Sequence, residues 1–229
     1  ELVAHLEAHR DALAPELRAL WLGSGGRTRG TWPEVFGAGP AGEEVFMAWH
    51  FARYTEAVAA AGKREYPLPM FVNAALVRPG HQPGQYPSGG PLPHLADVWR
   101  AAAPSIDFLA PDIYFQGFAE WARRYARPPN PLFVPEALRG PEASVNALYA
   151  FGAHDAIGFS PFGIESIGES AGRALAASYE AASYQHPDGP QGGPGGDGQR
   201  EPPPQPPSDD QTFKDLRERE IVRVLDAQG

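Results

Sequence analysis

Cysteine is absent from the 229-residue chain, so a disulfide framework and a thiolate metal site are both excluded. This absence does not choose between the cytoplasm and the periplasm. Basic residues are also few, with 19 Lys and Arg against 28 Asp and Glu and a formal net charge of -9. A nucleic-acid partner would need a basic patch, and no run of Lys or Arg supplies one.

Long hydrophobic runs are lacking as well. No stretch approaches the ~20 continuous apolar residues of a membrane-spanning helix, so no membrane partner is expected. The histidines and carboxylates show no metal-ligand spacing, which indicates no metal site. The glycine-rich stretch at 23–26 is not followed by the Lys and Ser or Thr of a phosphate-binding loop. The sequence therefore indicates no cofactor.

What the chain does contain is an alternation of short apolar segments and amphipathic segments. Helices are predicted over 1–22, divided near Pro15, and over 43–62, whereas 32–42 is predicted to be irregular with exposed aromatics. Apolar strands that alternate with helices imply parallel strands covered on both faces, so the expected class is α/β. The predicted strands are 70–76, 106–115, 132–136 and 156–162, and the predicted helices after them are 94–103, 118–125, 143–151 and 170–184.

The composition changes abruptly after residue 184. Residues 185–211 are rich in proline and glycine and carry no apolar side chain. Such a segment cannot bury enough surface to offset its ordering entropy, so a disordered linker is predicted. Residues 212–229 return to an amphipathic pattern, which predicts a C-terminal helix, and residues 1–184 form the predicted folded domain.

Polar side chains stand where three of the predicted strands end. The third strand, in PLFVPEA at 131–137, ends in the carboxylate of Glu136, and the C-terminal end of a parallel strand is where a (β/α) barrel keeps its catalytic groups. Asn73 is a candidate to bind a sugar hydroxyl, or forms a turn. Tyr114 is a candidate to orient Glu136 through its phenol or to stack on a sugar, or is a packed aromatic.

Three further residues are weaker candidates. Asp112 is a competing carboxylate, which we predict instead to cap a turn after Pro111. Glu165 follows the last strand and either binds substrate hydroxyls or lies on the rim. Trp32 is predicted to lie in a loop and is a candidate sugar platform, whereas the tryptophans at 49, 99 and 121 fall on helices and are predicted to pack in the core.

Five segments resemble the second half of a retaining β-galactosidase-type barrel, of the bacterial branch of glycoside hydrolase family 35, in the same clan as family 42. The resemblance covers roughly residues 1–184 and implies a (β/α)8 TIM barrel, of which the predicted strands are strands five to eight. The segments are EEVFMAWHFARYTEAVAAAGK at 43–63, YPLPMFVNAAL at 66–76, IDFLAPDIYF at 106–115, PLFVPEA at 131–137 and AIGFSPFGIES at 156–166.

The resemblance implies hydrolysis of terminal β-galactosides by double displacement. Glu136 matches the nucleophile of that clan, at the tip of strand seven. The clan's acid/base glutamate belongs to an Asn-Glu pair on strand four, and no such pair occurs in this sequence. The chain is therefore expected to be a fragment, to be inactive alone, and to self-associate through its open half barrel. Two other classes stay open: a non-catalytic carbohydrate-binding barrel remnant, and an interaction module that uses the C-terminal helix.

Overall fold

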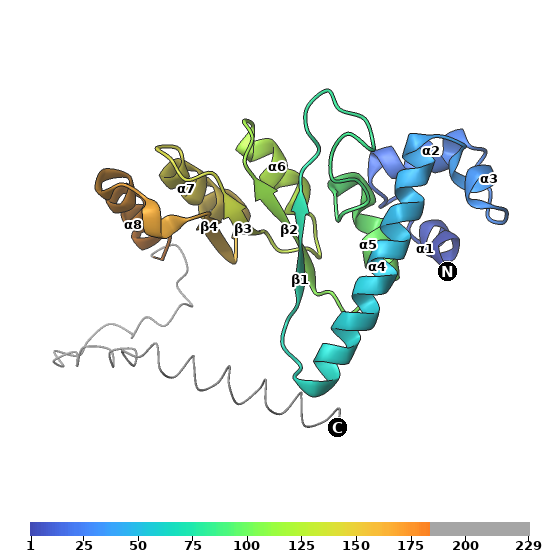
Figure 1. The fold of residues 1–229 in the computed structure, drawn as a ribbon, viewed down its shortest axis with the longest axis horizontal. Coiled ribbons are helices and arrows are strands. Elements are labelled where there is room, and N and C mark those ends of the chain that lie inside the picture. The colour runs from blue at the N-terminus through green and yellow to red at the C-terminus, as the bar shows by residue number, and fades with distance from the viewer. Residues whose placement is uncertain (184–229) are drawn as a thin grey trace, which may run out of the picture. The chain divides into compact units, whose positions relative to one another are not determined.

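The computed structural model describes residues 1–183, and a four-stranded sheet runs through this part of the chain (Figure 1). The strands lie side by side in chain order, and each adjacent pair is parallel. All four predicted strands are present, and the predicted α/β class is confirmed. The strands are β1 (Phe71–Ala75), β2 (Phe108–Ile113), β3 (Phe133–Ala137) and β4 (Gly158–Pro161).

Helices precede the sheet and follow each of its strands. The helix after each strand falls where the alternating pattern predicts it, and Pro15 begins the second helix as expected for a proline in a first turn. The helices are α1 (Leu2–Ala8), α2 (Pro15–Gly23), α3 (Trp32–Phe36), α4 (Pro40–Glu65), η1 (Pro93–Leu95), α5 (Ala96–Ala102), α6 (Phe118–Tyr125), α7 (Ala143–His154), η2 (Ile164–Ser166) and α8 (Glu169–Ser183).

The prediction that 32–42 is irregular is wrong, because α3 and the start of α4 occupy it. The backbone N–H of Thr31 donates to the Glu34 carboxylate at 2.7 Å, which satisfies an N-terminal donor of the short helix. Phe36, expected to be exposed, is only 2% exposed. Gly42 allows the turn before α4 to approach closely, since a Cβ there would lie 2.2 Å from the Gly37 carbonyl oxygen.

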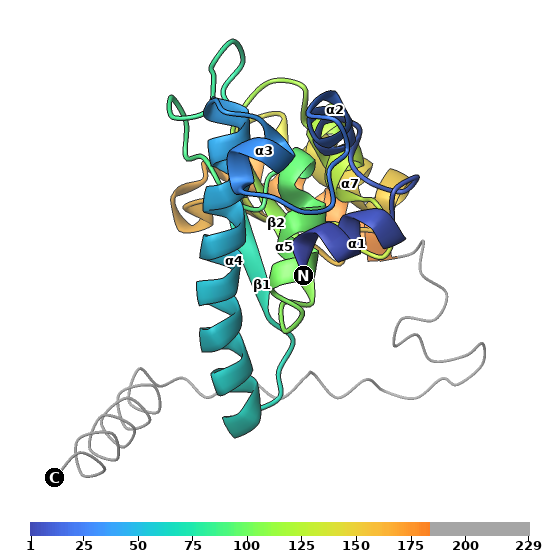
Figure 2. The ribbon, with the colours of Figure 1, turned by 90° about the vertical axis from the view of Figure 1, so that its right-hand side faces the viewer.

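Helices α5 to α8 are arranged along the sheet from the β1 end to the β4 end (Figure 1). Helix α6 contacts β2, and α7 contacts both β4 and α8. The long helix α4 contacts α5 and stands beside β1, with α3 near its N-terminal end (Figure 2). The core between these layers is apolar, and its fully buried side chains include Leu92, Leu95, Val98, Leu132 and Val134.

The strands also have a more open face. In β1, Phe71 and Asn73 are exposed, whereas Ala74, which follows Asn73, is buried. The rings of Phe71, Phe108 and Phe133 form one cluster on this face, with centroids 4.9–5.9 Å apart. The backbone of Gly158 closes the row, because a Cβ there would lie 2.7 Å from the Phe133 ring.

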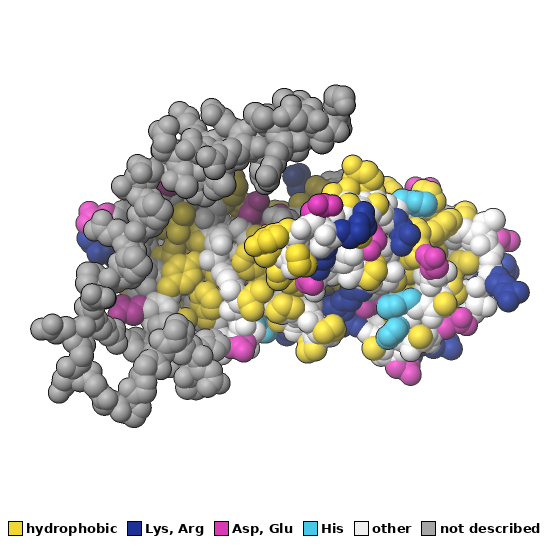
Figure 3. All heavy atoms as spheres, turned by 90° about the horizontal axis from the view of Figure 1, so that it is seen from below, with side chains coloured by type: hydrophobic (Ala, Val, Ile, Leu, Met, Phe, Trp, Pro, Cys, Tyr) yellow, Lys and Arg dark blue, Asp and Glu magenta, His cyan; other side chains and the backbone are white. Residues whose placement is uncertain are grey.

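Apolar side chains are also visible on the outside of this part of the chain. From below, Figure 3 shows yellow hydrophobic side chains gathered near the middle of the face, with charged side chains more frequent toward the end that carries α1 to α3. Within residues 1–183 no helix is long and apolar enough to cross a membrane. The predicted linker at 185–211, the predicted helix at 212–229 and Tyr184 lie outside the described residues.

Candidate functional site

The C-terminal ends of β1, β2 and β3 bring four of the candidate residues together. Parallel strands end at the same edge of a sheet, so side chains near their ends become neighbours. The register sets Ala75 beside Asp112, and Asp112 beside Glu136. We call Asn73, Asp112, Tyr114 and Glu136 the strand-end cluster.

Two side-chain hydrogen bonds organise this cluster. The amide Nδ2 of Asn73 donates to Asp112 Oδ1 at 3.1 Å, between β1 and β2. The hydroxyl of Tyr114 donates to Glu136 Oε2 at 2.9 Å, between the end of β2 and β3. The Tyr114 phenol therefore lies where it can orient the Glu136 carboxylate. The Asn73 amide is bound by a second carboxylate, that of Asp112.

The prediction that Asp112 caps a turn is wrong. Pro111 and Asp112 both continue β2, and the carboxylate reaches across to the neighbouring strand. The sequence prediction failed because a Pro-Asp pair is typical of turns, whereas this strand continues through Ile113. The cluster thus contains two carboxyl groups on adjacent strands.

The environment of the cluster changes its acid–base behaviour. Burial, followed by the negative charge of Glu136, raises the pKa of Asp112 to about 6, and the Asn73 hydrogen bond opposes both effects. Burial also raises the pKa of Tyr114 to about 12, together with its hydrogen bond to Glu136. The phenol therefore remains a donor at neutral pH, and Asp112 binds a proton in the weakly acidic range.

Glu165 lies apart from these hydrogen bonds. It is exposed on η2, which follows β4, and the hydrogen bonds of the strand-end cluster within residues 1–183 do not include it. Nearby, Arg139 Nη1 donates to the carbonyl of Gly163 at 2.8 Å. This contact ties the segment after β3 to the segment after β4, so Arg139 is a rim residue that the sequence reasoning missed.

Trp32 was predicted to lie in a loop, which is wrong, since it opens α3. Its ring contacts Phe36 and Phe46 at centroid distances of 5.4 and 5.3 Å, and also approaches Trp49 and His50. The ring lines a cavity of about 530 Å³ at the start of α4, together with Phe46. Its ring contacts are thus within α3 and α4, and the structure does not join it to the strand-end cluster.

A second cavity adjoins Tyr114. It has a volume of about 370 Å³ and lies beside the segments that follow β2 and β3. Its polar side chains come from Gln116, Glu142 and Asn146, which no sequence pattern singled out, although loops after parallel strands are the usual place for binding residues. The apolar part of the lining is Ile113, Phe115, Phe118 and Leu138.

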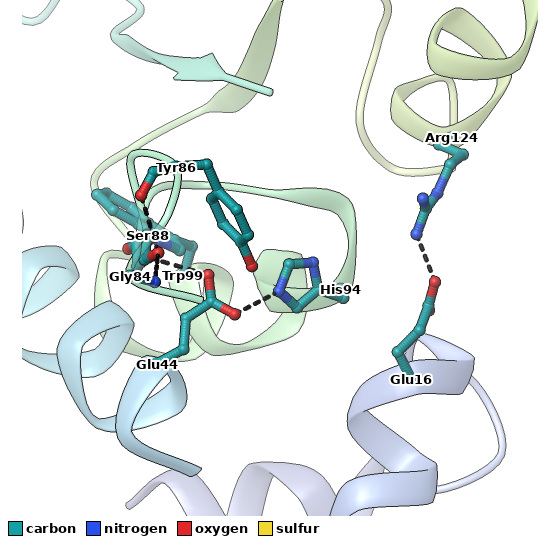
Figure 4. Close-up of polar contacts among 9 residues, drawn as sticks. Glu16, Glu44, Gly84, Tyr86, Ser88, His94, Trp99 and Arg124 are labelled. Atoms are coloured by element: carbon teal, nitrogen blue, oxygen red, sulfur yellow. Dashed lines mark hydrogen bonds and ion pairs between the residues drawn. The ribbon is translucent and has the colours of Figure 1, made fainter. Parts of the chain in front are cut away.

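Glu44 carries a buried carboxylate that lies outside the strand-end cluster and is hydrogen-bonded by groups from the segment between β1 and α5 (Figure 4). Glu44 of α4 is 3% exposed, and its Oε2 lies 2.9 Å from His94 Nε2. The backbone N–H of Gly89 donates to its Oε1 at 3.3 Å, and the Tyr86 hydroxyl also hydrogen-bonds the carboxylate. We call these four residues the Glu44 clamp, since they tie α4 to the long segment between β1 and α5.

Neighbouring contacts support the clamp. The indole of Trp99 donates to the Gly89 carbonyl at 3.1 Å, and Tyr125 donates to the Pro91 carbonyl at 2.9 Å. Burial and the bond to Glu44 raise the pKa of Tyr86 well above its usual value. Both carboxylate oxygens of Glu44 already have hydrogen-bond partners within the protein. The Glu44 clamp therefore fits a structural role better than a catalytic one.

In the part of the chain that the structure describes, no group of three His, Cys, Asp or Glu side chains is placed to hold a metal ion. No protein-family model matches the chain, and no curated protein matches it. The strand-end cluster is therefore the candidate functional site of the described residues.

Proposed function

We propose that residues 1–184 are the second half of a (β/α)8 barrel of the retaining β-galactosidase type, with Glu136 as its nucleophile. The observation that carries this proposal is the position of Glu136 at the C-terminal end of a parallel strand, where its carboxylate accepts the Tyr114 hydroxyl. Four parallel strands, each followed by a helix, are compatible with half of such a barrel.

To act as a nucleophile, Glu136 must be ionised and held in one orientation. Its carboxylate attacks the anomeric carbon, the bond to the leaving oxygen breaks, and a glycosyl ester forms that water then hydrolyses. A hydrogen bond from Tyr114 to Oε2 fixes the rotation of the carboxylate. Asn73 lies near the end of β1, which β2 separates from β3, and an amide there can bind a sugar hydroxyl.

The second carboxyl of a retaining pair lies ~5–5.5 Å from the first and protonates the leaving group. By resemblance, that acid/base would come from an Asn-Glu pair that this sequence does not contain. We therefore propose that the chain alone does not hydrolyse ordinary β-galactosides and that it needs a complementary half to do so.

Exposed apolar surface supports the proposal of a half barrel. On α4, Met47, Phe51, Tyr54 and Val58 are spaced by four, three and four residues, so they share one side of the helix, and all are exposed. Phe71 on the open face of the sheet is 40% exposed. In a closed barrel, side chains from all the strands fill the interior and would cover Phe71, and neighbouring helices of the outer ring would pack against α4.

A mechanism-based inhibitor tests the nucleophile directly. A 2-deoxy-2-fluoro-β-galactosyl fluoride loses fluoride without needing a proton, so the missing acid does not prevent attack by Glu136. We expect one added fluorogalactosyl group in the intact mass, and a peptide map should place it on Glu136. Glu136→Gln should abolish the label, and Glu165→Gln should retain it. A label on Asp112 or Glu165, or no label on a chain that circular dichroism shows to be folded, would overturn the proposal.

A further inference from the structure

Asp112 is a carboxyl group to which the proposed reaction gives no role. It lies beside Glu136 in the pairing of β2 with β3, and its Oδ1 accepts a hydrogen bond from Asn73 on β1. It is partly buried rather than solvated. Asp112 therefore holds the candidate sugar-binding amide and interacts electrostatically with the candidate nucleophile.

We propose that Asp112 is a positioning residue of the strand-end cluster: its carboxyl group fixes the Asn73 amide, and the hold on that amide changes when Asp112 binds a proton. The contact with Asn73 and the protonation of Asp112 are properties of the folded chain. Their use, which is to present the Asn73 amide to a sugar hydroxyl, rests on the proposed function.

The geometry places the Asn73 contact on a carboxyl group that binds a proton. Asp112 Oδ1 accepts the amide of Asn73, and Asp112 pairs with Glu136 in the register of β2 and β3. Burial of Asp112 and the negative charge of Glu136 both favour the protonated form of Asp112. Together they exceed the opposing effect of the Asn73 hydrogen bond, which agrees with a pKa of about 6.

The other titratable groups that interact with Asp112 do not compete for this proton. Tyr114 follows it at the end of β2, and Tyr125 approaches from α6. Burial raises the pKa of both phenols, so both stay neutral throughout the acidic and neutral range. Among the titratable partners, Glu136 is therefore the one whose charge raises the pKa of Asp112. The proton exchanges with solvent, so no covalent step is involved.

Nuclear magnetic resonance of the full chain tests this proposal without any sugar. The side-chain amide signals of Asn73 and the carboxyl carbon of Asp112 are followed from pH 3 to pH 8. We expect both to move with the same midpoint, near pH 6. Glu136→Gln removes the neighbouring charge and should lower that midpoint by about one unit. Asp112→Asn should abolish the movement of the Asn73 signals, whereas the amide of Asn146 on α7 serves as the control that does not follow.

Three results would overturn the role of Asp112: an Asp112 midpoint near pH 4, an Asp112 midpoint that is unchanged in Glu136→Gln, or Asn73 amide signals that do not shift with the titration of Asp112. Because no substrate is used, these results leave the glycosidase proposal standing if the fluorosugar labels Glu136. A shared titration of Asn73 and Asp112 in a chain that the fluorosugar does not label would uphold the positioning of Asn73 by Asp112 and remove its catalytic purpose.

Discussion

Glu44→Ala should destabilise the fold more than any single change at the strand-end cluster, because it empties the Glu44 clamp. The carboxylate is 3% exposed and is bound by Gly89, Tyr86 and His94. Removing the carboxylate leaves the N–H of Gly89 and the hydroxyl of Tyr86 unsatisfied, at about 1–3 kcal/mol each and about 2–6 kcal/mol together. That sum brackets the cost of about 3–5 kcal/mol for removing one partner of a buried salt bridge, which we take as the expected loss.

The loss is measured by urea unfolding followed by tryptophan fluorescence. Trp99 reports on the clamp directly, because its indole donates to the Gly89 carbonyl. A loss of about 3–5 kcal/mol corresponds to a fall in Tm of roughly 6–20 °C for a chain of this size. Glu44→Gln keeps the shape and one acceptor oxygen, so its loss should be smaller, about 1–2 kcal/mol.

The matched control is Glu43→Ala, one residue earlier on the same helix, where the carboxylate is exposed. It should change the free energy of unfolding by less than about 1 kcal/mol, through its interaction with the helix dipole alone. Equal losses for Glu43→Ala and Glu44→Ala, or a Glu44→Ala variant within about 0.5 kcal/mol of the parent chain, would refute the structural role of the clamp.

Three other outcomes are expected. The pKa of Asp112 is about 6 in the folded state, above its ordinary value of 3.8. The contribution of protonated Asp112 to the free energy of unfolding is therefore complete below pH 4 and is lost as the pH rises through 6. Asp112→Asn should remove that loss, and it should gain about 1 kcal/mol relative to the parent between pH 4 and pH 7, after allowance for solvent screening, in urea melts at each pH. Gly42→Ala places a Cβ against the Gly37 carbonyl and should cost about 1–3 kcal/mol, and a Tm equal to that of the parent would show that the turn before α4 gives way. Light scattering should show concentration-dependent association of the chain, and Phe51→Lys with Tyr54→Lys should reduce it; a monomer at every concentration would contradict the open apolar surface.

The sequence by itself determined the order of the strands and α-helices from β1 to α8. Apolar runs of strand length alternate with segments of helical period, which is the pattern of parallel strands joined by helices. The expected cover on both faces of the sheet is wrong for β1, where Phe71 and Asn73 are exposed. The sequence also identified Glu136, Tyr114 and Asn73 as strand-end residues, because the end of an apolar run can be read directly from the chain. The helix over 32–36 escaped prediction, although Thr31 and Glu34 have the spacing of a capping box, because the segment is short and the burial of Phe36 depends on tertiary packing.

Only the tertiary structure decided which polar residues meet. Asp112 and Glu136 are 24 positions apart, and their pairing depends on the register of two parallel strands, which no local pattern encodes. The same holds for Glu44, which meets His94 across 50 positions. The sequence marks a carboxylate on a helix, but its burial, its donors and its structural role exist only once a distant segment folds over it, because desolvation and hydrogen bonding depend on neighbours in space.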